Sequence, residues 1–465
     1  MKRKVLALVL VAGLIAGLMA ACGGGTSSND TPGSPAAADT ASTGTAAAEP
    51  QKELTGTFQY WSCYSGDSAK WEQWRVDEFN KKFESQGLKC EVQFVPDGAG
   101  ISNGKLLSAI ASGTGPDLIV VDNATNAYSY AANGSFEPLD SYLEKAGIDI
   151  KGFFPGTSDV MYYKDSTYLI PQDSNVVMLY YNVDLVKAAG LDPENPPKTI
   201  EDLDKWAEAL TIKNSDGSYK QLGFIPWQDH GGEAWIMPFL FGANVYDTDT
   251  NKLDLTSAAV QNYLKWVKSY ADKYGIEKIN AITANAGGRS TPDHPFYNKK
   301  IAMTVTLNSF THLMDVYGPK DINYKVAPVP TPADGSGRAD STTFITNVFA
   351  VPKGAKNIDQ ALQFVHFSLS AEISADNYDT WRSIPCIDSE FDKVSWTQKG
   401  DEIYALERKL ANSPKSGIPA LTSVSTELGD AFKTLRESVI YSKADIASSL
   451  QALQDQYQAE LDAKK

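Results

Sequence analysis

The sequence predicts an α/β protein in which strands and helices alternate around a parallel sheet. A short apolar strand at 57–61, an amphipathic helix at 69–83 and a second strand at 90–95 make one strand, helix, strand unit. The run at 117–121 is apolar after its first residue, which is typical of a parallel strand buried on both faces. Together these observations predict the α/β class.

The remaining elements follow from spacing. A helix is expected at 105–112, and the turn at 113–116 leads from it into the strand at 117–121. Residues 256–270 carry apolar side chains at helical spacing, so this helix should pack against the protein. The stretch 435–461 reads as one or two helices that face solvent.

The N-terminus predicts export. Lys2, Arg3 and Lys4 precede an apolar run at 5–18 that is shorter than a membrane-spanning helix. The ending Met-Ala-Ala-Cys resembles the bacterial lipobox, with Met where Leu is usual, so residues 1–21 are predicted to be a signal peptide and Cys22 a lipidated N-terminus. The alternative is an ordinary signal peptide cut near Ala21, which leaves Cys22 unmodified.

Composition narrows the class of protein. Residues 22–52 lack large apolar side chains and are predicted to form a flexible linker, and the rest is long enough for two or three domains. The chain is 42% hydrophobic and 21% charged, and no second apolar stretch of spanning length follows the signal. Its net charge of −15 argues against a nucleic-acid partner.

Several segments together resemble one known family. KLLSAIASGTGPDLIVVDN, YAANGSFEPLDSYLEKAG and YLIPQDSNVVMLYYNVDLVKAAGLDPENPPKTIEDL are similar to family 1 extracellular solute-binding proteins of bacterial ABC importers, the group that contains maltose-binding protein. YNKKIAM, YKVAPVPTP, VFAVPKGAKNIDQALQFVHFSLS and SIPCIDSEF continue the likeness in the same order. The resemblance covers about the whole chain after the linker.

The resemblance implies a two-lobed periplasmic-binding-protein-like (type II) fold with a ligand cleft between discontinuous α/β lobes. Chain crossings are expected near 168–175, near 342–348 and near Phe391. The N-terminal lobe would then comprise 53–170 and 346–392, and the C-terminal lobe 171–345 and 393–465. Closure around a solute would make the surface that a permease recognises.

The candidate ligand-binding residues favour a carbohydrate, because amides and carboxylates bind hydroxyl pairs and aromatic rings stack on sugar faces. Ligands sit beyond the carboxyl ends of strands in such sheets. From strand ends and expected crossings, the candidates are Trp61, Ser62, Asp122, Asn123, Asp173, Asn175, Trp227, Asp229, Trp235, Asn308, Phe310, Thr342 and Arg382.

Each candidate has a plainer alternative. The tryptophans could belong to the core, Asp122 and Asn123 could cap a helix, and Asp173 and Asn175 could satisfy backbone groups. Asn308 and Phe310 stand where relatives often carry Gly and Trp, and Thr342 stands near paired glycines of relatives. Arg382 could bind a hydroxyl or a solute carboxylate, or form a surface ion pair.

The predicted function is capture of a carbohydrate, an oligosaccharide by preference, for delivery to an importer's permease and ATPase. The predicted protein is a monomer outside the cytoplasm, it touches the membrane only through its lipid, and it has no cofactor. The same fold could bind a peptide, polyamine or sugar acid. A secreted polysaccharide-degrading enzyme is the other alternative, although no HExxH or P-loop is present.

Metal and disulfide chemistry are weakly indicated. The four histidines are dispersed, and 247–251 starts like a calcium loop but lacks its Gly and its bidentate Glu, so a hairpin turn is expected there. Cys63, Cys90 and Cys386 are an odd number. A Cys63–Cys90 bridge is disfavoured, because the two should lie at opposite ends of neighbouring strands.

Overall fold

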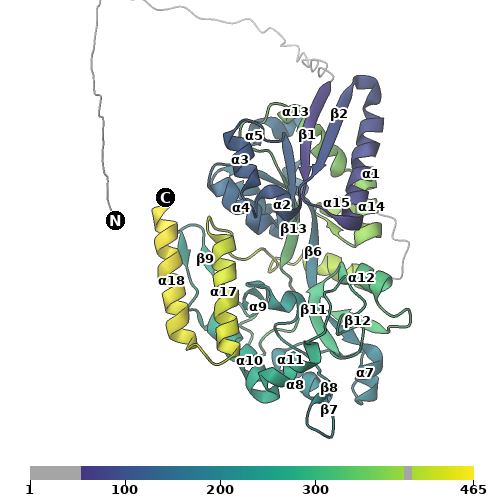
Figure 1. The fold of residues 1–465 in the computed structure, drawn as a ribbon, viewed down its shortest axis with the longest axis vertical. Coiled ribbons are helices and arrows are strands. Elements are labelled where there is room, and N and C mark those ends of the chain that lie inside the picture. Colours follow the sequence, from purple (N-terminus) through teal and green to yellow (C-terminus); the bar gives the residue numbers. More distant parts are fainter. Residues whose placement is uncertain (1–53, 392–400, 465) are drawn as a thin grey trace, which may run out of the picture. The chain divides into compact units, whose positions relative to one another are not determined.

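The structure is a computed structural model that describes residues 54–391 and 401–464 (Figure 1). The signal peptide, the lipidation at Cys22 and the linker, all predicted within 1–52, lie outside these residues, as do residues 392–400 beside the third expected crossing. Among the described residues, no helix combines the length and the apolar character that crossing a membrane requires.

One sheet organises the molecule. Its strands follow the order β11-β6-β13-β3-β1-β2, and β12 and β14 also pair with β6. The strands are β1 (Gly56–Ser62), β2 (Leu88–Phe94), β3 (Leu118–Val121), β6 (Leu169–Asn182), β11 (Met303–Leu307), β12 (Tyr324–Ala327), β13 (Phe344–Ala350) and β14 (Ile384–Pro385).

The parallel part of the sheet confirms the predicted class. β1 pairs in parallel with β2 and with β3, and every residue of β3 is fully buried, as its apolar run predicted. The sheet as a whole is mixed, because β13 pairs with β3 and β6 in antiparallel fashion. Local patterning predicted the parallel strands, whereas β13 joins them from more than 200 positions further along the chain.

β6 connects the two parts of the sheet. All 14 of its residues are buried. Its first part pairs with β13 and β14, and its last part, from Val177 onward, pairs with β11 and β12. A single strand therefore supplies the polar residues 172–175 to the region where the two parts of the sheet meet.

Apolar side chains form three buried clusters. One gathers residues from 58–170 and 348–386 together with Leu421. A second gathers residues from 177–329 and 420–461. A third, from 154–180, 296–344 and 378–411, packs on β6 through Val176, Met178 and Tyr180, which alternate with residues of the second cluster.

The helices cover both parts of the sheet. The α-helices are α1 (Gly66–Lys82), α2 (Pro96–Gly100), α3 (Lys105–Ala111), α4 (Ala124–Ala132), α5 (Asp140–Ala146), α6 (Pro155–Ser158), α7 (Val183–Ala188), α8 (Ile200–Ala209), α9 (Ile236–Leu240), α10 (Ala258–Tyr274), α11 (Ile276–Thr283), α12 (Phe310–Tyr317), α13 (Ile358–Ser368), α14 (Ala371–Trp381), α15 (Asp388–Phe391), α16 (Asp401–Ala411), α17 (Ser425–Ile440) and α18 (Ile446–Ala463). Short 3₁₀ helices are η1 (Glu84–Gln86), η2 (Ile150–Gly152), η3 (Asp159–Met161) and η4 (Asp229–Gly232).

The described part of the chain also contains three two-stranded hairpins: β4 (Tyr162–Tyr163) with β5 (Ser166–Thr167), β7 (Ile212–Lys213) with β8 (Tyr219–Gln221), and β9 (Tyr246–Asp247) with β10 (Lys252–Leu253). The β9–β10 pairing confirms that 247–251 is a hairpin turn. Lys252 pairs with Asp247 across this turn.

The structure confirms three of the predicted helices and changes the description of the C-terminal ones. α1, α3 and α10 confirm the expected helices, and α10 buries the apolar stripe that predicted it. The C-terminal helices differ from the prediction, because α17 begins ten residues earlier and buries one full face, including Leu428 and Phe432. α18 buries Leu450 and Leu453 on its inner face, so these helices are amphipathic covers of the core.

The three cysteines within the described residues are free thiols and buried. Cys90 lies beside Phe58 in the β1–β2 pairing, whereas Cys63 follows the other end of β1, as predicted. Burial raises the pKa of all three thiols, so they stay protonated at neutral pH.

Candidate functional site

Within the described residues, two cavities with room for a ligand are lined by predicted ligand-binding residues. A cavity of 620 Å³ is lined by Asp173 and Asn175, and a smaller one of 170 Å³ is lined by Asn123 and Trp235. Strand alternation explains the first pair, since residues two apart on β6 face the same side. Asn347 of β13 pairs directly with Asp173 and also lines the larger cavity, so β6 and β13 form its floor.

Asp173 is held by a ring of amides. Its carboxylate accepts hydrogen bonds from Gln172 Nε2 at 2.5 Å, Asn347 Nδ2 at 2.8 Å and Asn377 Nδ2 at 3.0 Å. Burial raises the pKa of Asp173, and these donors oppose that rise. Arg75 donates to Gln172 Oε1 at 3.0 Å, which fixes the amide so that its NH₂ group faces Asp173.

Asn175 has an unsatisfied acceptor. Its side chain is 7% exposed, and Nδ2 donates to Ser383 Oγ at 3.4 Å. Oδ1 is buried and has no hydrogen-bond partner among the described residues. A buried carbonyl oxygen without a partner is costly, so this atom is suited to a donor brought by a ligand.

Aromatic rings stand around this floor. Tyr64 follows β1, Trp71 lies on α1, Tyr317 ends α12 and Trp381 ends α14, and all four line the 620 Å³ cavity. In Figure 1, α1 and α14 lie above α12, so the rings come from both sides of the sheet's junction. Trp381 contacts the ring of His312 edge-on at 5.0 Å, which joins α14 to α12.

Arg289 places an unpaired cation in the same cavity. Its guanidinium lines the cavity and forms no hydrogen bond or ion pair with a described residue. Burial lowers the pKa of Arg289, and the nearby Asp229 carboxylate partly offsets this effect. Arginine remains charged, so Arg289 contributes a positive charge to a cavity that Asp67 and Asp173 also line.

The 170 Å³ cavity lies between α4, α17 and the start of β13. Asn126 Oδ1 accepts a hydrogen bond from Thr426 Oγ1 at 2.9 Å, which ties α4 to α17. Trp235 is 6% exposed and stacks on Phe432 with ring centres 4.3 Å apart, and its Nε1 has no partner among the described residues. An indole donor is thus available at this cavity.

His230 supplies the other polar group of this cavity. Both of its ring nitrogens are buried without a hydrogen-bond partner among the described residues. Burial lowers the pKa of His230 to about 3, and the positive charge of Arg289 acts in the same direction. The imidazole is therefore neutral at physiological pH, with one donor and one acceptor unused.

Asn123 caps helix α4, which is the alternative role that the sequence suggested for it. Its Oδ1 accepts from the backbone N–H of Thr125 at 2.9 Å at the start of α4, and its side chain also lines the smaller cavity. The neighbouring Asp122 is exposed and lines neither cavity. Capping and a ligand contact are compatible, because a carboxamide has an NH₂ group left over.

The other predicted residues line neither cavity, and two of them hold β6. Asn308 Oδ1 accepts from Val176 N–H at 3.1 Å, and Thr342 Oγ1 accepts from Val177 N–H at 2.7 Å. Phe310 is fully buried in the third apolar cluster. These three residues support the junction from within.

Asp229 and the remaining aromatic residues also have internal partners. Asp229 accepts from Thr304 Oγ1 at 2.6 Å and contacts His294 Nε2 at 3.0 Å, and His294 and Thr304 hold its pKa low against burial. Trp61 is buried with Lys105 over its ring at 4.8 Å, and Trp227 packs on the second cluster.

Ser62 and Arg382 are enclosed as well. Ser62 is fully buried and its Oγ accepts from Tyr64 N–H at 3.3 Å. Arg382 donates to the carbonyl oxygen of Tyr378 at 3.4 Å and lies 3.8 Å from Asp379. A ligand contact of any predicted residue stays a prediction.

The prediction from sequence included neither Arg289 nor any of the four aromatic residues that line the 620 Å³ cavity. Trp381 precedes the predicted Arg382, and Tyr64 follows the predicted Ser62 by two positions, so both lie next to segments that drew attention. Arg289 lies in 284–295, which has no regular element and no motif. No group of three or more His, Cys, Asp or Glu side chains within the described ranges is placed to hold a metal ion.

Comparisons with known proteins agree with this architecture. The family model described as "Bacterial extracellular solute-binding protein" matches residues 66–375. The sn-glycerol-3-phosphate-binding periplasmic protein UgpB of Escherichia coli K12 is 28% identical over 289 residues, which cover 60% of this chain and 62% of that protein. The match thus spans less than two thirds of that relative's length. UgpB of Pectobacterium atrosepticum is 25% identical over 76% of this chain and 79% of its own.

Solved structures share the fold. A structure of CpMnBP1 with mannotriose bound has a TM-score of 0.75 and 29% identity, and covers 86% of this chain and 99% of that chain. The sugar-binding protein MalE from Xanthomonas citri has a TM-score of 0.70 at 16% identity over 88% of this chain and 98% of its own, which shows the fold alone. The periplasmic-binding-protein-like fold is confirmed, and the chain belongs to the bacterial extracellular solute-binding protein family.

Proposed function

We propose that this chain captures a carbohydrate, by preference an oligosaccharide, in the cavity over β6 and β13 and delivers it to the permease of an ABC importer. The observation that carries the proposal is the unsatisfied Oδ1 of Asn175 on a floor of amides and a carboxylate, with four aromatic rings around it. Sugar hydroxyls donate to such acceptors, and sugar C–H faces stack on aromatic rings.

The size and relatives of the site support this choice. A volume of 620 Å³ is within the range of small-ligand sites. CpMnBP1, which is similar to this chain at 29% identity, was solved with mannotriose and with mannobiose. Neutral amides outnumber unpaired charges on the floor, which suits a neutral polyol.

Ligand closure is part of the proposal. The lobes would be 53–170 with 346–392 and 171–345 with 393–465, joined through β6 and β13. Tyr64 and Trp381 lie in one lobe so defined, and Tyr317 and Arg289 in the other, so a bound solute would contact both. A ligand that contacts both lobes favours the closed arrangement because it binds that state more tightly.

The finer features of the transport role are also proposals. Cys22 would carry the lipid that anchors the chain to the outer face of the membrane or in the periplasm, and 22–52 would be its linker. The protein would act as a monomer with a permease and an ATPase and would leave its solute chemically unchanged. The curated relatives are named as binding proteins, which supports a non-enzymatic role.

A binding assay tests the function. Purified protein is heated with mannobiose, mannotriose and other oligosaccharides, and with amino acids, peptides and polyamines as controls. Ligand at one hundred times its dissociation constant should add about 2.7 kcal/mol of stability and raise Tm. Binding of a non-sugar class alone would overturn the substrate, and consumption of the sugar would overturn the receptor role.

A variant pair localises the binding. Asn175→Ala removes the unsatisfied acceptor and should weaken sugar binding by about 1 kcal/mol, or roughly fivefold. Asn285→Ala is the matched control, because Asn285 is exposed and lies outside both cavities. Equal affinities of the two variants would contradict a sugar site on β6.

An acidic solute is the second candidate, and Arg289 is the observation that favours it. An unpaired guanidinium in a cavity suits a phosphate or carboxylate, and two curated relatives are named as sn-glycerol-3-phosphate-binding proteins. Arg289→Gln should abolish binding of sn-glycerol-3-phosphate if the solute is acidic. A small effect on a neutral sugar, with no binding of the phosphate by the parent protein, would reject this candidate.

A further inference from the structure

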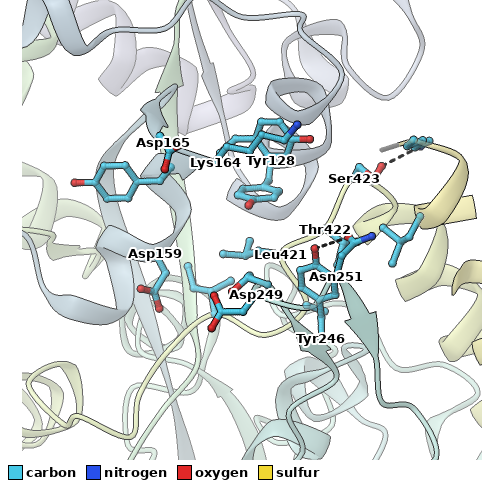
Figure 2. A pocket seen from close by; sticks show the side chains of 17 residues that line it. Tyr128, Asp159, Lys164, Asp165, Tyr246, Asp249, Asn251, Leu421, Thr422 and Ser423 are labelled. Carbon is cyan, nitrogen blue, oxygen red and sulfur yellow. Dashed lines mark hydrogen bonds between the residues drawn. The ribbon is translucent and has the colours of Figure 1, made fainter.

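Another cavity, of 780 Å³, lies apart from the floor of β6 and β13. It shares no lining residue with the 620 Å³ cavity and only Ile418 with the 170 Å³ cavity. Figure 2 shows it between two sets of side chains, with Tyr128, Lys164 and Asp165 on one side and Tyr246 on the other. The first set comes from α4 and the β4–β5 turn, and Tyr246 comes from the β9–β10 hairpin.

Three tyrosines converge on this space. Tyr128 and Tyr163 meet edge-to-face with ring centres 6.0 Å apart and an interplanar angle of 83°, and Tyr246 approaches from the hairpin. Burial raises the pKa of Tyr128 to about 12, and the proximity of the other two hydroxyls adds to the rise. The tyrosines therefore present rings and hydroxyls to one volume.

The hydrogen-bonding capacity of the site is incompletely used. Tyr128 is only 8% exposed, yet its hydroxyl forms no hydrogen bond with a described residue. Tyr246 donates to Asn251 Oδ1 at 2.9 Å, while Nδ2 of Asn251 is buried and has no partner in the described part of the chain. The Nδ2 donor of Asn251 and the hydroxyl of Tyr128 are thus available to hydrogen-bond a ligand.

Charges of both signs border the cavity without forming an ion site. Three carboxylates and two ammonium groups line it, from Asp159, Asp165, Asp249, Lys164 and Lys464. Lys164 lies over the ring of Tyr163 at 5.3 Å, and Lys464 donates to the carbonyl of Ser423 at 3.1 Å. With no dominant charge, the site favours a neutral ligand rich in hydroxyl groups over an anion or a metal ion.

We propose that this cavity is a second carbohydrate site, separate from the site over β6 and β13. Its tyrosine rings would stack on a sugar face, and Tyr128, Asn251 and Asp249 would bind its hydroxyls. The assignment goes beyond the proposed transport function and does not depend on which solute fills the first site.

The segment 417–425 borders the second site and is tied to β13. Ile418 borders both the 170 Å³ and the 780 Å³ cavities, and Ala420 borders the larger of them. Gly417 is bonded to β13, since Phe344 N–H donates to its carbonyl at 3.2 Å. Ser425 Oγ, at the start of α17, donates to the carbonyl of Ala420 at 2.6 Å. A sugar in the second site would therefore contact a segment that is hydrogen-bonded to β13, the strand whose Asn347 lines the first site.

Equilibrium dialysis of the whole protein with labelled mannotriose tests the proposal. The parent protein should bind a second sugar molecule at higher concentration. Tyr128→Phe and Asp249→Ala should each weaken this second event about fivefold, as expected for one lost hydrogen bond, and leave the first event in place. Tyr142→Phe and Asp321→Ala are matched controls, because neither residue lines a described cavity.

The outcomes are distinct. A second event that both cavity variants weaken and both controls retain supports the site. A single event unaffected by any of the four variants overturns the second site and leaves the transport proposal intact. A second event that survives both cavity variants unchanged also overturns this location. Absence of all sugar binding overturns the second site and the proposed sugar receptor together.

Discussion

Replacing Arg75 by methionine removes one half of a buried ion pair beneath the candidate site. The side chain of Arg75 is 1% exposed and that of Glu72 is 0% exposed. Arg75 Nη2 lies 2.7 Å from both oxygens of Glu72 and 3.0 Å from Gln172 Oε1. Its guanidinium also lies over three rings, at 5.1–5.3 Å from the centres of Trp71, Phe349 and Phe364.

The expected cost follows from what remains after the substitution. Methionine keeps most of the stem, so the loss of packing is small, but Glu72 is left charged in a water-excluded core. Breaking a buried pair in this way costs about 3–5 kcal/mol. Arg75→Met/Glu72→Leu removes both charges and should cost only about 1–2 kcal/mol, mainly because Gln172 loses a donor.

Urea unfolding followed by tryptophan fluorescence measures both variants. The single variant should be less stable than the double variant by about 2 kcal/mol or more. The sugar affinity of Arg75→Met should also fall, since Arg75 fixes the Gln172 amide that donates to Asp173. Equal stability of the single and double variants would refute the view that the uncompensated carboxylate dominates the cost.

Two further predictions concern pH and packing. The pKa of His230 is about 3 in the folded protein and near 6.5 when unfolded, so the unfolded chain binds more protons between these values and stability should rise with pH there. His230→Gln should reduce the slope of the unfolding free energy against pH by about 1.4 kcal/mol per pH unit between these two pKa values. An unchanged slope would contradict the assignment of this pH dependence to His230. A Cβ on Gly156 would lie 2.2 Å from the ring of Phe344, so Gly156→Ala should destabilise by about 1–3 kcal/mol in thermal unfolding. Gly288→Ala is the control, because no atom lies within 4 Å of its added Cβ, and equal Tm values for the two variants would contradict the packing argument.

Local patterns predicted the parts of the fold that local physics determines. The apolar run of β3 is buried on both faces, and the apolar stripe of α10 faces the core, because period and burial are linked directly. Local patterns could not predict that β13 joins the sheet in antiparallel orientation. Its partner β6 lies more than 160 positions away, and nothing in the composition of β13 encodes strand direction.

Of the residues that line the 620 Å³ cavity, Asp173 and Asn175 were predicted, from the chain crossing that the family resemblance implied. Asp173 and Asn175 line the cavity because alternation on β6 places them on one face. Asn308 and Phe310 face the interior, where they bind β6 and fill the third cluster, since the turn after β11 directs them inward. Arg289 lies in an irregular segment, where sequence carries no period from which a direction could be inferred.

A crystal structure of the protein soaked with mannotriose tests the central claim most directly. We predict sugar density on the floor formed by β6 and β13, with a hydroxyl within hydrogen-bond distance of Asn175 Oδ1 and a ring face against Trp381, Tyr64 or Tyr317. Sugar density elsewhere with this floor filled by water, or Asn175 Oδ1 bonded to a protein donor in the complex, would contradict the claim that this cavity is the carbohydrate site.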